Sequence, residues 1–187
     1  MSRRFKLVCI GNGAIGKTCL LNVFVKDEFP EVYVPTVLQE DVADISVDEV
    51  EYELNIFDTA GQEDLDRLRP TVYPGTHVAL ICFSIDRPES FDAIETKWVK
   101  EFRHYCPGIN YILVGLKSDL RKSNNSETSD EDLVKIEKSE ELAKSIKAYA
   151  YVECSAKTKE NVHLVFEKAV HAALANPKTR QKGCNLV

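Results

Sequence analysis

The residue pattern with the clearest chemistry is a glycine-rich segment that ends in a lysine and a hydroxyl residue. It has the form G-x-x-x-x-G-K-[ST] and reads Gly11-Asn12-Gly13-Ala14-Ile15-Gly16-Lys17-Thr18. Such a segment curls the backbone so that successive N–H groups face an anion. Lys17 then reaches outer phosphates, and the Thr18 hydroxyl ligates Mg²⁺. The alternative is an ordinary glycine-rich turn, but a predicted strand before the segment and a predicted helix after it favour a phosphate site.

A second segment has the composition expected around a metal ion and a terminal phosphate. It reads Asp58-Thr59-Ala60-Gly61-Gln62-Glu63 and directly follows a predicted strand. Asp58 therefore lies where ligands gather in open α/β sheets, and it is expected to hold Mg²⁺ through water. Gly61 lets a backbone N–H approach the third phosphate, and the Gln62 amide can orient a water molecule. A lone aspartate after a strand is usually a turn residue, so this interpretation depends on the glycine-rich segment that precedes it.

Two further segments at predicted strand ends can select a base. They read Leu116-Lys117-Ser118-Asp119 and Cys154-Ser155-Ala156-Lys157. An ionised Asp119 only accepts hydrogen bonds, and guanine offers two adjacent donors where adenine offers none. Such a pair can reject the wrong base by about 10⁴-fold. Lys117 is expected to lie along the ring, and the second segment to present backbone N–H groups to the guanine carbonyl. Each string alone is common on protein surfaces, and only their order favours the nucleotide.

The elements that position these segments alternate between strands and helices. Near-continuous apolar runs at residues 78–84 and 111–116 are typical of central parallel strands. The alternation predicts a P-loop NTPase fold, a doubly wound and mostly parallel six-stranded α/β sheet with helices on both faces. The remaining expected strands are residues 5–10, 42–47, 52–57 and 151–153, with a turn at Asp48-Glu49; the expected helices are residues 16–25, 88–105, 136–147 and 160–174, and one helical stripe holds Phe91, Ile94, Trp98 and Phe102.

Composition limits the class of protein. The chain has 187 residues, of which 44% are hydrophobic, enough for one compact domain. A net charge of -6 argues against nucleic acid as a partner. None of the six cysteines forms a C-x-x-C pair, which disfavours zinc and suits a reducing, cytosolic compartment. The sequence contains no apolar stretch of membrane-spanning length.

Taken together, these residues resemble a Ras-superfamily small GTPase over nearly the whole chain. Residues 58–64 and several long strings are similar to the Rho family specifically. The strings are Phe29-Pro30-Glu31-Val32-Tyr33-Val34-Pro35-Thr36-Val37, Asp66-Arg67-Leu68-Arg69-Pro70, Cys82-Phe83-Ser84-Ile85-Asp86 and Glu153-Cys154-Ser155-Ala156-Lys157-Thr158.

The resemblance implies roles for further residues. Thr36 would bind Mg²⁺ and the gamma-phosphate in the GTP state only, Tyr33 would close over the phosphates, and Phe29 would stack edge-on against the base. Residues 29–40 and 60–76 would form two switch loops that the third phosphate orders. The expected metal ligands are Thr18, Thr36 and Asp58, and the expected nucleotide-binding set is Asn12, Gly13, Ala14, Ile15, Gly16, Lys17, Thr18, Cys19, Phe29, Tyr33, Pro35, Thr36, Asp58, Gly61, Lys117, Asp119, Ser155, Ala156 and Lys157.

The chain departs from the family at a few positions. Leu116 replaces the usual asparagine, which cross-links loops, so nucleotide release is expected to be faster than in relatives with asparagine. Leu38-Gln39 and Leu65 replace common residues in or beside the switches, and the insertion at residues 122–136 is short for a Rho protein.

The C-terminus predicts a lipid attachment site. Cys184-Asn185-Leu186-Val187 fits a C-a-a-X box, and Lys178, Arg180 and Lys182 supply a basic flank. The alternative is a chance cysteine near a polar end. We therefore expect a GTPase domain at residues 1–175 and a flexible tail at residues 176–187, with the protein in the cytoplasm and prenylated at Cys184 on the cytoplasmic face of the plasma membrane.

The expected activity is slow hydrolysis of GTP to GDP. Gln62 orients water for in-line attack, and Lys17 and Mg²⁺ stabilise the developing charge. The resemblance implies a monomer whose partners are exchange factors, GTPase-activating proteins, a GDP dissociation inhibitor and effectors, with cytoskeletal control as the setting. Two alternatives remain at this point, a nucleotide-dependent binding module without catalysis and an ATP-using P-loop kinase.

Overall fold

The computed structural model describes residues 3–30, 38–59, 61, 66–122 and 133–176. A six-stranded sheet with the order β2-β3-β1-β4-β5-β6 forms its centre. All neighbouring strands are parallel except β2 and β3, which are antiparallel. The strands are β1 (Arg3–Gly11), β2 (Leu38–Val47), β3 (Val50–Thr59), β4 (Val78–Ser84), β5 (Tyr111–Leu116) and β6 (Ala150–Cys154).

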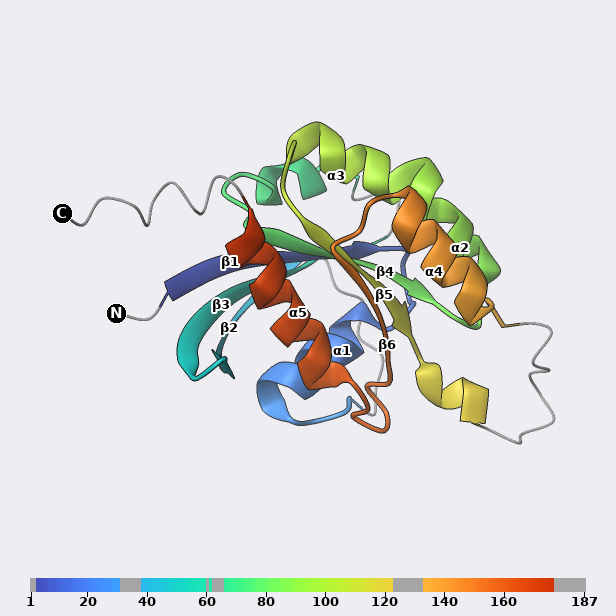
Figure 1. Ribbon diagram of the computed structural model, residues 1–187, viewed down its shortest axis with the longest axis horizontal. Coiled ribbons are helices and arrows are strands. Elements are labelled where there is room, and N and C mark those ends of the chain that lie inside the picture. The colour runs from blue at the N-terminus through green and yellow to red at the C-terminus, as the bar shows by residue number, and fades with distance from the viewer. Residues whose placement is uncertain (1–2, 31–37, 60, 62–65, 123–132, 177–187) are drawn as a thin grey trace.

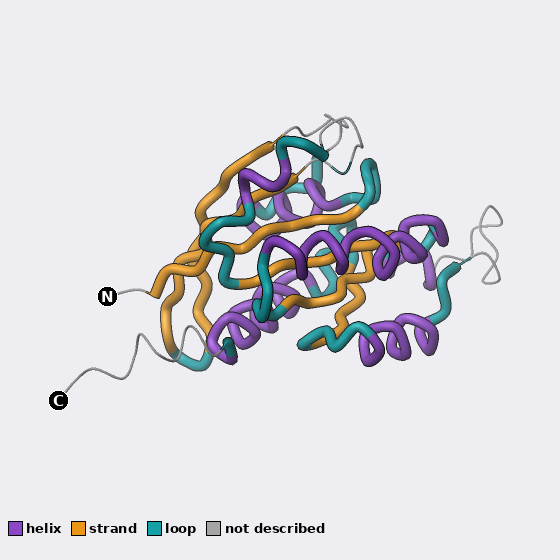
Figure 2. Tube along the Cα trace, turned by 90° about the horizontal axis from the view of Figure 1, so that it is seen from above, coloured by secondary structure: helices purple, strands orange, loops and turns teal. Residues whose placement is uncertain are grey.

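Helices cover both faces of this sheet, as predicted. Helices α1 and α5 pack on one face, and α2, α3 and α4 pack on the other (Figures 1 and 2). The helices are α1 (Lys17–Lys26), α2 (Pro88–Ala93), α3 (Val99–Tyr105), α4 (Ile136–Ser145) and α5 (Val162–Ala175), with short 3-10 turns η2 (Arg69–Val72) and η4 (Ser118–Lys122) and a π-helical turn η3 (Ile94–Trp98).

The central strands are buried on both sides because helices cover both faces. In β4, Leu80 and Cys82 pack toward α1 and α5, whereas Ile81 and Phe83 pack toward α2 and α3. The near-continuous apolar sequence of β4 is what such a strand requires. Its bounds agree with the predicted strand at residues 78–84.

The hairpin between β2 and β3 also forms as predicted. Asp48 and Glu49 occupy its turn, and both have positive φ angles, 52° and 63°. Two such residues in succession match the twist of the flanking strands. The strands extend beyond the predicted ranges because the antiparallel ladder continues from Val47↔Val50 to Leu38↔Thr59.

Two predictions about helices and boundaries need correction. The expected continuous helix at residues 88–105 is interrupted by η3, although Ile94, Trp98 and Phe102 are all buried as the stripe implied. The predicted flexible tail begins at Asn176, but this residue is fully buried. Its Nδ2 donates to the His77 carbonyl at 2.6 Å, so the folded domain includes Asn176. Most of the insertion at residues 122–136 lies outside the described residues.

Candidate functional site

The carboxyl ends of the parallel strands meet at one edge of the sheet, and the glycine-rich segment leaves β1 there. Gly16 caps the start of α1 with φ 106°, a left-handed conformation that residues with a Cβ avoid. The helix therefore begins directly at Lys17, with the first N–H groups of α1 facing the loop. This is the arrangement that the sequence predicted for binding phosphate.

Lys17 lies inside this loop. Only 6% of the residue is exposed, and its Nζ donates to the carbonyls of Gly11 at 2.9 Å and Asn12 at 2.7 Å. Burial lowers the pKa of the Lys17 ammonium from its usual value. A phosphate in the loop would offset this effect, because a nearby negative charge favours the protonated amine.

Thr18 and Asp58 meet beside the lysine although they are forty positions apart in sequence. The Thr18 hydroxyl donates to Asp58 Oδ2 at 2.6 Å, and Asp58, near the end of β3, is buried. A hydroxyl and a carboxylate oxygen are hard donors that suit Mg²⁺. The described residues contain no cluster of three or more His, Cys, Asp or Glu side chains that could hold a metal. A magnesium bound by few protein ligands and by phosphate oxygens fits this donor set.

Gly61 approaches the glycine-rich loop more closely than any other residue type could. A Cβ added to it would lie 2.1 Å from the Gly11 carbonyl oxygen and 2.4 Å from the Gly13 nitrogen. Contacts this short do not occur for real Cβ atoms. The segment after β3 therefore packs backbone against backbone on the loop, where the sequence placed the third phosphate.

Asp119 and Ser155 meet at the other end of the same sheet edge. The Ser155 hydroxyl donates to Asp119 Oδ1 at 2.6 Å and accepts from the Thr158 N–H at 3.1 Å. The Ser155 N–H donates to the Glu160 carbonyl at 3.0 Å, so it is not among the backbone N–H groups that this segment has available for a base. Ser155 instead orients the carboxylate that can accept from guanine, and the N–H groups of Ala156 and Lys157 remain as candidate donors.

Asp86 is a residue of this site that sequence reasoning missed. Lys117 has a left-handed backbone with φ 66°, and its Nζ lies 2.9 Å from Asp86 Oδ2. Burial would raise the pKa of the Asp86 carboxyl, but hydrogen bonding from Ser84 and the interaction with Lys117 outweigh it and hold the pKa below its usual value. The signal was present in the sequence, since Asp86 follows the end of β4 as Asp58 and Asp119 follow other strands.

Leu116, at the end of β5, packs near the glycine-rich loop. It is buried within the core cluster that contains α1 and α5. Its Cδ1 lies 4.0 Å from the position that a Cβ on Gly16 would occupy. At this position the chain therefore has apolar packing by leucine, whereas the family pattern has an asparagine that cross-links loops.

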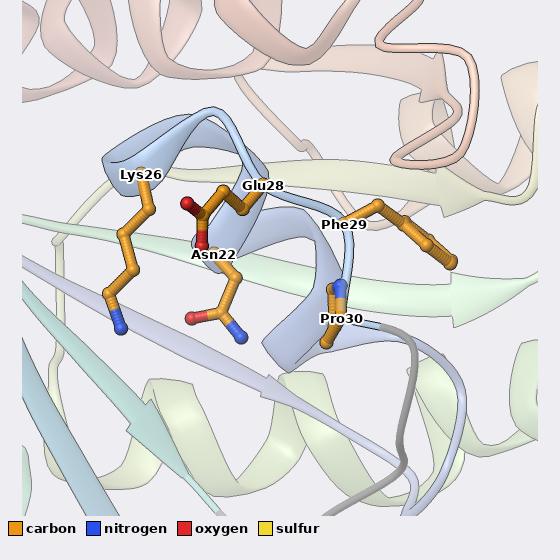
Figure 3. A pocket seen from close by; sticks show the side chains of 5 residues that line it. All are labelled: Asn22, Lys26, Glu28, Phe29 and Pro30. Atoms are coloured by element: carbon orange, nitrogen blue, oxygen red, sulfur yellow. The ribbon is translucent and has the colours of Figure 1, made fainter.

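Phe29 borders a pocket at the far end of α1 from Lys17. The pocket holds about 490 Å³ and is lined by Asn22, Lys26, Glu28, Phe29 and Pro30. Phe29 is 45% exposed, and its ring extends away from the side chains of Asn22 and Lys26 (Figure 3). An exposed ring at this position is free of core packing and can stack on a ligand.

The remaining predicted site residues are either part of the described structure or outside the residues that it describes. Cys19 lies half-buried in the first turn of α1, and burial raises the pKa of its thiol. Tyr33, Pro35, Thr36, Gln62 and Cys184 lie outside the described residues.

Comparison with known proteins agrees with this geometry. A model of the Ras family matches residues 6–175. Rho-related GTP-binding protein RhoB from Homo sapiens, Mus musculus and Rattus norvegicus is in each case 54% identical over 185 residues, covering 97% of this chain and 94% of the relative. The chain therefore belongs to the Ras family of small GTP-binding proteins.

Within that class it is a Rho-type small GTPase, a switch that binds GDP and GTP and hydrolyses GTP. Regulatory proteins and effectors are the kinds of partner that accompany such a switch. Among the described residues, no helix is both long and apolar enough to cross a membrane.

Proposed function

We propose that GTP and Mg²⁺ bind along the sheet edge from Lys17 to Asp119 and that Gln62 orients the water that attacks the gamma-phosphate. The observation that carries this proposal is the 2.6 Å contact between Thr18 and Asp58 beside the buried Lys17 ammonium. Hydroxyl, carboxylate and ammonium groups converge there on a loop of backbone N–H groups. That combination suits a triphosphate with a divalent ion better than any neutral ligand.

Each residue has a distinct task in this proposal. Lys17 binds outer phosphate oxygens and offsets the charge that develops during transfer. Thr18, Asp58 and Thr36 would hold Mg²⁺, which supplies neutralisation of the phosphate charge. Gln62 positions water without itself changing protonation state.

Base recognition would fall to the other end of the site. Asp119, held by the Ser155 hydroxyl, accepts from the two adjacent donors of guanine. Slow intrinsic turnover is part of this proposal, and the ion pairs that engage Arg69 with Glu101 and Asp66 are consistent with it. An arginine supplied by an activating protein would then raise the rate, as it does for Ras itself, where the gain is about 10⁵-fold.

Single-turnover hydrolysis of GTP tests the catalytic assignment. Gln62→Leu should retain GTP binding and slow hydrolysis by about 10²-fold or more, because water loses its orienting group. Gln181→Leu is the matched control, since Gln181 is the same residue type and belongs to the segment at residues 176–187, to which no nucleotide role is assigned. Rapid hydrolysis by Gln62→Leu would refute the role of this glutamine, and no hydrolysis by the wild type would favour a pure binding module.

Competition between GTP and ATP tests the base assignment. Excess ATP should not displace labelled GTP from the wild type, because adenine lacks the donors that Asp119 accepts. Equal competition by the two nucleotides would instead favour an ATP-using enzyme.

We also propose that Cys184 carries a prenyl group and holds the protein on the cytoplasmic face of the plasma membrane. The C-a-a-X sequence and the basic residues before it support this proposal. Exchange factors, activating proteins, a GDP dissociation inhibitor and effectors that contact the two switch loops would be its partners, and the protein would act as a monomer. In membrane flotation, cell-derived wild type should float with membranes and Cys184→Ser should not. Both should bind GTP. Equal flotation of the two proteins would contradict lipid attachment at Cys184.

A further inference from the structure

Trp98 reaches from the π-helical turn η3 to the glycine-rich loop. The residue is buried, and its indole Nε1 donates to Asn12 Oδ1 at 2.6 Å. Asn12 follows Gly11 at the start of the loop, eighty-six positions away from Trp98. The chain contains a single tryptophan, so this contact has no duplicate elsewhere in the sequence.

Asn12 also contacts two parts of the candidate site. Its backbone carbonyl accepts from Lys17 Nζ at 2.7 Å. A Cβ on Gly61 would lie 2.2 Å from its carbonyl carbon, which shows how closely the segment after β3 packs on it. Any movement of Asn12 would therefore displace the loop around both Lys17 and Gly61.

Two cationic side chains lie against the Trp98 ring, one from η2 and one from the residue that precedes it in η3. The guanidinium of Arg69 lies 4.6 Å from the ring centroid, and the Lys97 ammonium lies 4.9 Å from it. Both distances are in the range of cation–π attraction. Through Arg69 the ring is thereby joined to the segment at residues 66–73. This segment begins five positions after Gly61 in the sequence.

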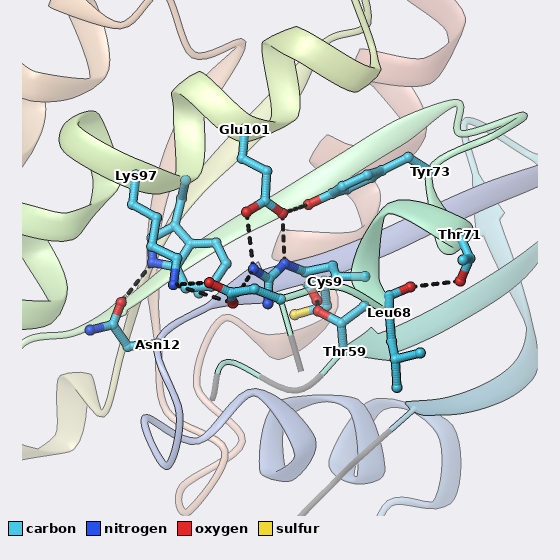
Figure 4. A network of polar contacts seen from close by, with 12 residues as sticks. Cys9, Asn12, Thr59, Leu68, Thr71, Tyr73, Lys97 and Glu101 are labelled. Carbon is cyan, nitrogen blue, oxygen red and sulfur yellow. Dashed lines mark hydrogen bonds and ion pairs between the residues drawn. The ribbon is translucent and has the colours of Figure 1, made fainter. Parts of the chain in front are cut away.

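Arg69 is itself fixed by a partly buried network of ion pairs. Its Nε donates to Glu101 Oε1 at 2.6 Å, and its Nη2 donates to Asp66 Oδ1 at 2.6 Å. Lys97 Nζ lies 2.9 Å from Asp66 Oδ2, and the Tyr73 hydroxyl donates to Glu101 (Figure 4). A satisfied network of this kind has one preferred arrangement, so it orients the indole rather than merely enclosing it.

We propose that Trp98 is a positioning residue of the nucleotide site. Through its hydrogen bond to Asn12 it fixes the phosphate-binding loop, and through Arg69 it couples that loop to residues 66–73. The inference rests on the proposed function, because the loop must bind nucleotide for the coupling to matter. If Trp98 were only a core residue, a side chain without the indole N–H could replace it with no effect on nucleotide binding.

Release of a fluorescent GDP analogue separates these two roles. Trp98→Phe keeps an aromatic ring between Arg69 and Lys97 but removes the donor to Asn12. Release should accelerate by about 2- to 10-fold, the range expected for one hydrogen bond. Phe102→Leu is the matched control, because it also reduces a buried aromatic residue of this helical segment but does not touch Asn12, and its release rate should equal that of the wild type.

A double-mutant cycle tests whether the effect passes through Asn12. In the Asn12→Ala background Trp98→Phe should not accelerate release further, whereas in Asn12→Asp, which keeps an acceptor oxygen, it should. The emission of the sole tryptophan gives a second measurement, since removal of nucleotide should shift it in the wild type and less in Asn12→Ala.

The possible outcomes separate the two proposals. Equal acceleration by Trp98→Phe in the wild-type and Asn12→Ala backgrounds, or no acceleration in either, would overturn the role of Trp98 while leaving nucleotide binding intact. Failure of the wild type to bind the GDP analogue would overturn the proposed function together with this inference.

Discussion

Leu116 is the single residue whose chemistry most changes the base-binding end of the site. It supplies a buried hydrocarbon side chain 4.0 Å from the position of a Cβ on Gly16. Packing of this kind is less directional than a hydrogen bond. At this point the loop around Gly16 consequently contacts β5 through apolar packing and not through a hydrogen bond.

Restoring an amide at this position should slow nucleotide release. Leu116→Asn places a donor and an acceptor beside the backbone of the glycine-rich loop, and one added hydrogen bond corresponds to about 2- to 10-fold in rate. Leu116→Ala removes the packing without adding an amide and should not slow release. Stopped-flow release of fluorescent GDP measures both variants, and an unchanged or faster rate in Leu116→Asn would contradict the expectation.

Lys17 gives the nucleotide-free protein a defined dependence on pH. Its folded pKa is lowered by burial, so between that pKa and the ordinary value of about 10.4 the unfolded chain binds more protons. The contribution of Lys17 to the free energy of unfolding therefore rises with pH in this window. The cost of burying the charged amine is fully present below it.

Lys17→Met provides the comparison for this pH dependence. Urea unfolding of nucleotide-free protein should show the difference in stability shifting in favour of the wild type as the pH is raised from about 7 toward about 10. Saturating GDP should stabilise the wild type relative to Lys17→Met at both pH values. A difference that is constant across this range would contradict a lowered pKa of Lys17 in the folded protein.

Much of the site's chemistry at this scale was predictable from sequence, because motif order places Lys17, Thr18 and Asp58 together. The Asp86–Lys117 pair and the Trp98–Asn12 bond were not predictable in the same way. They depend on which side chains neighbouring elements bring into reach, and no local spacing encodes that. The bond from the Ser155 N–H to the Glu160 carbonyl was not predictable either, since Glu160 belongs to the turn before α5.

At the scale of elements, the end of β3 and the start of α1 act as one unit. Gly61 follows β3 and packs on the loop that precedes α1, with the Thr18–Asp58 bond alongside. The geometry leaves no volume for a side chain at this junction. The two elements can remain together only if residue 61 is glycine.

Gly61→Ala should force these elements apart. A Cβ 2.1 Å from the Gly11 carbonyl oxygen cannot be accommodated by rotating a side chain, because its neighbours are backbone atoms. Nucleotide affinity, measured by calorimetry with GDP and a GTP analogue, should fall, with the larger loss for the GTP analogue. Gly108→Asn is the control, since a Cβ at Gly108 meets open space and asparagine tolerates its left-handed φ of 76°. Equal affinities for Gly61→Ala and the wild type would contradict the contact.

The bounds of the two central strands β4 and β5 were predicted correctly because these strands have the strongest sequence signal. Residues 78–84 and 111–116 are continuous apolar runs, and the observed strands have these bounds. The π-helical turn η3 has no comparable signature, because Ile94 and Trp98 fit a regular helical stripe equally well. Its extra residue per turn reflects the fit of Trp98 and its neighbours into the tertiary structure.

At the scale of the whole molecule, Asn176 joins the end of α5 to the starts of two strands. Its Oδ1 accepts from the Asn110 N–H at 2.9 Å, and its Nδ2 donates to the His77 carbonyl at 2.6 Å. His77 precedes β4 and Asn110 precedes β5. One polar side chain thus closes the end of the sheet that lies opposite the nucleotide edge.

Asn176→Ala should destabilise the fold without changing the nucleotide site. Two backbone groups lose their partner, each at a cost of about 1–3 kcal/mol. Chemical unfolding in saturating GDP should show the loss, and GDP affinity should stay at the wild-type value. Asn22→Ala, at the half-buried border of the pocket beside α1, should be close to neutral; matching stabilities for the two variants would indicate that the bonds of Asn176 contribute little.

The position of Asn176 also decides where the proposed lipid-anchored tail would join the folded domain. The start of β1 and the end of α5 lie at the end of the sheet where the parallel strands begin (Figure 1). A tether that continues from Asn176 would join the folded domain at this end of the sheet. The edge that carries Lys17 and Asp119 lies at the opposite end of the sheet, so the proposed lipid anchor would join the domain away from the nucleotide site.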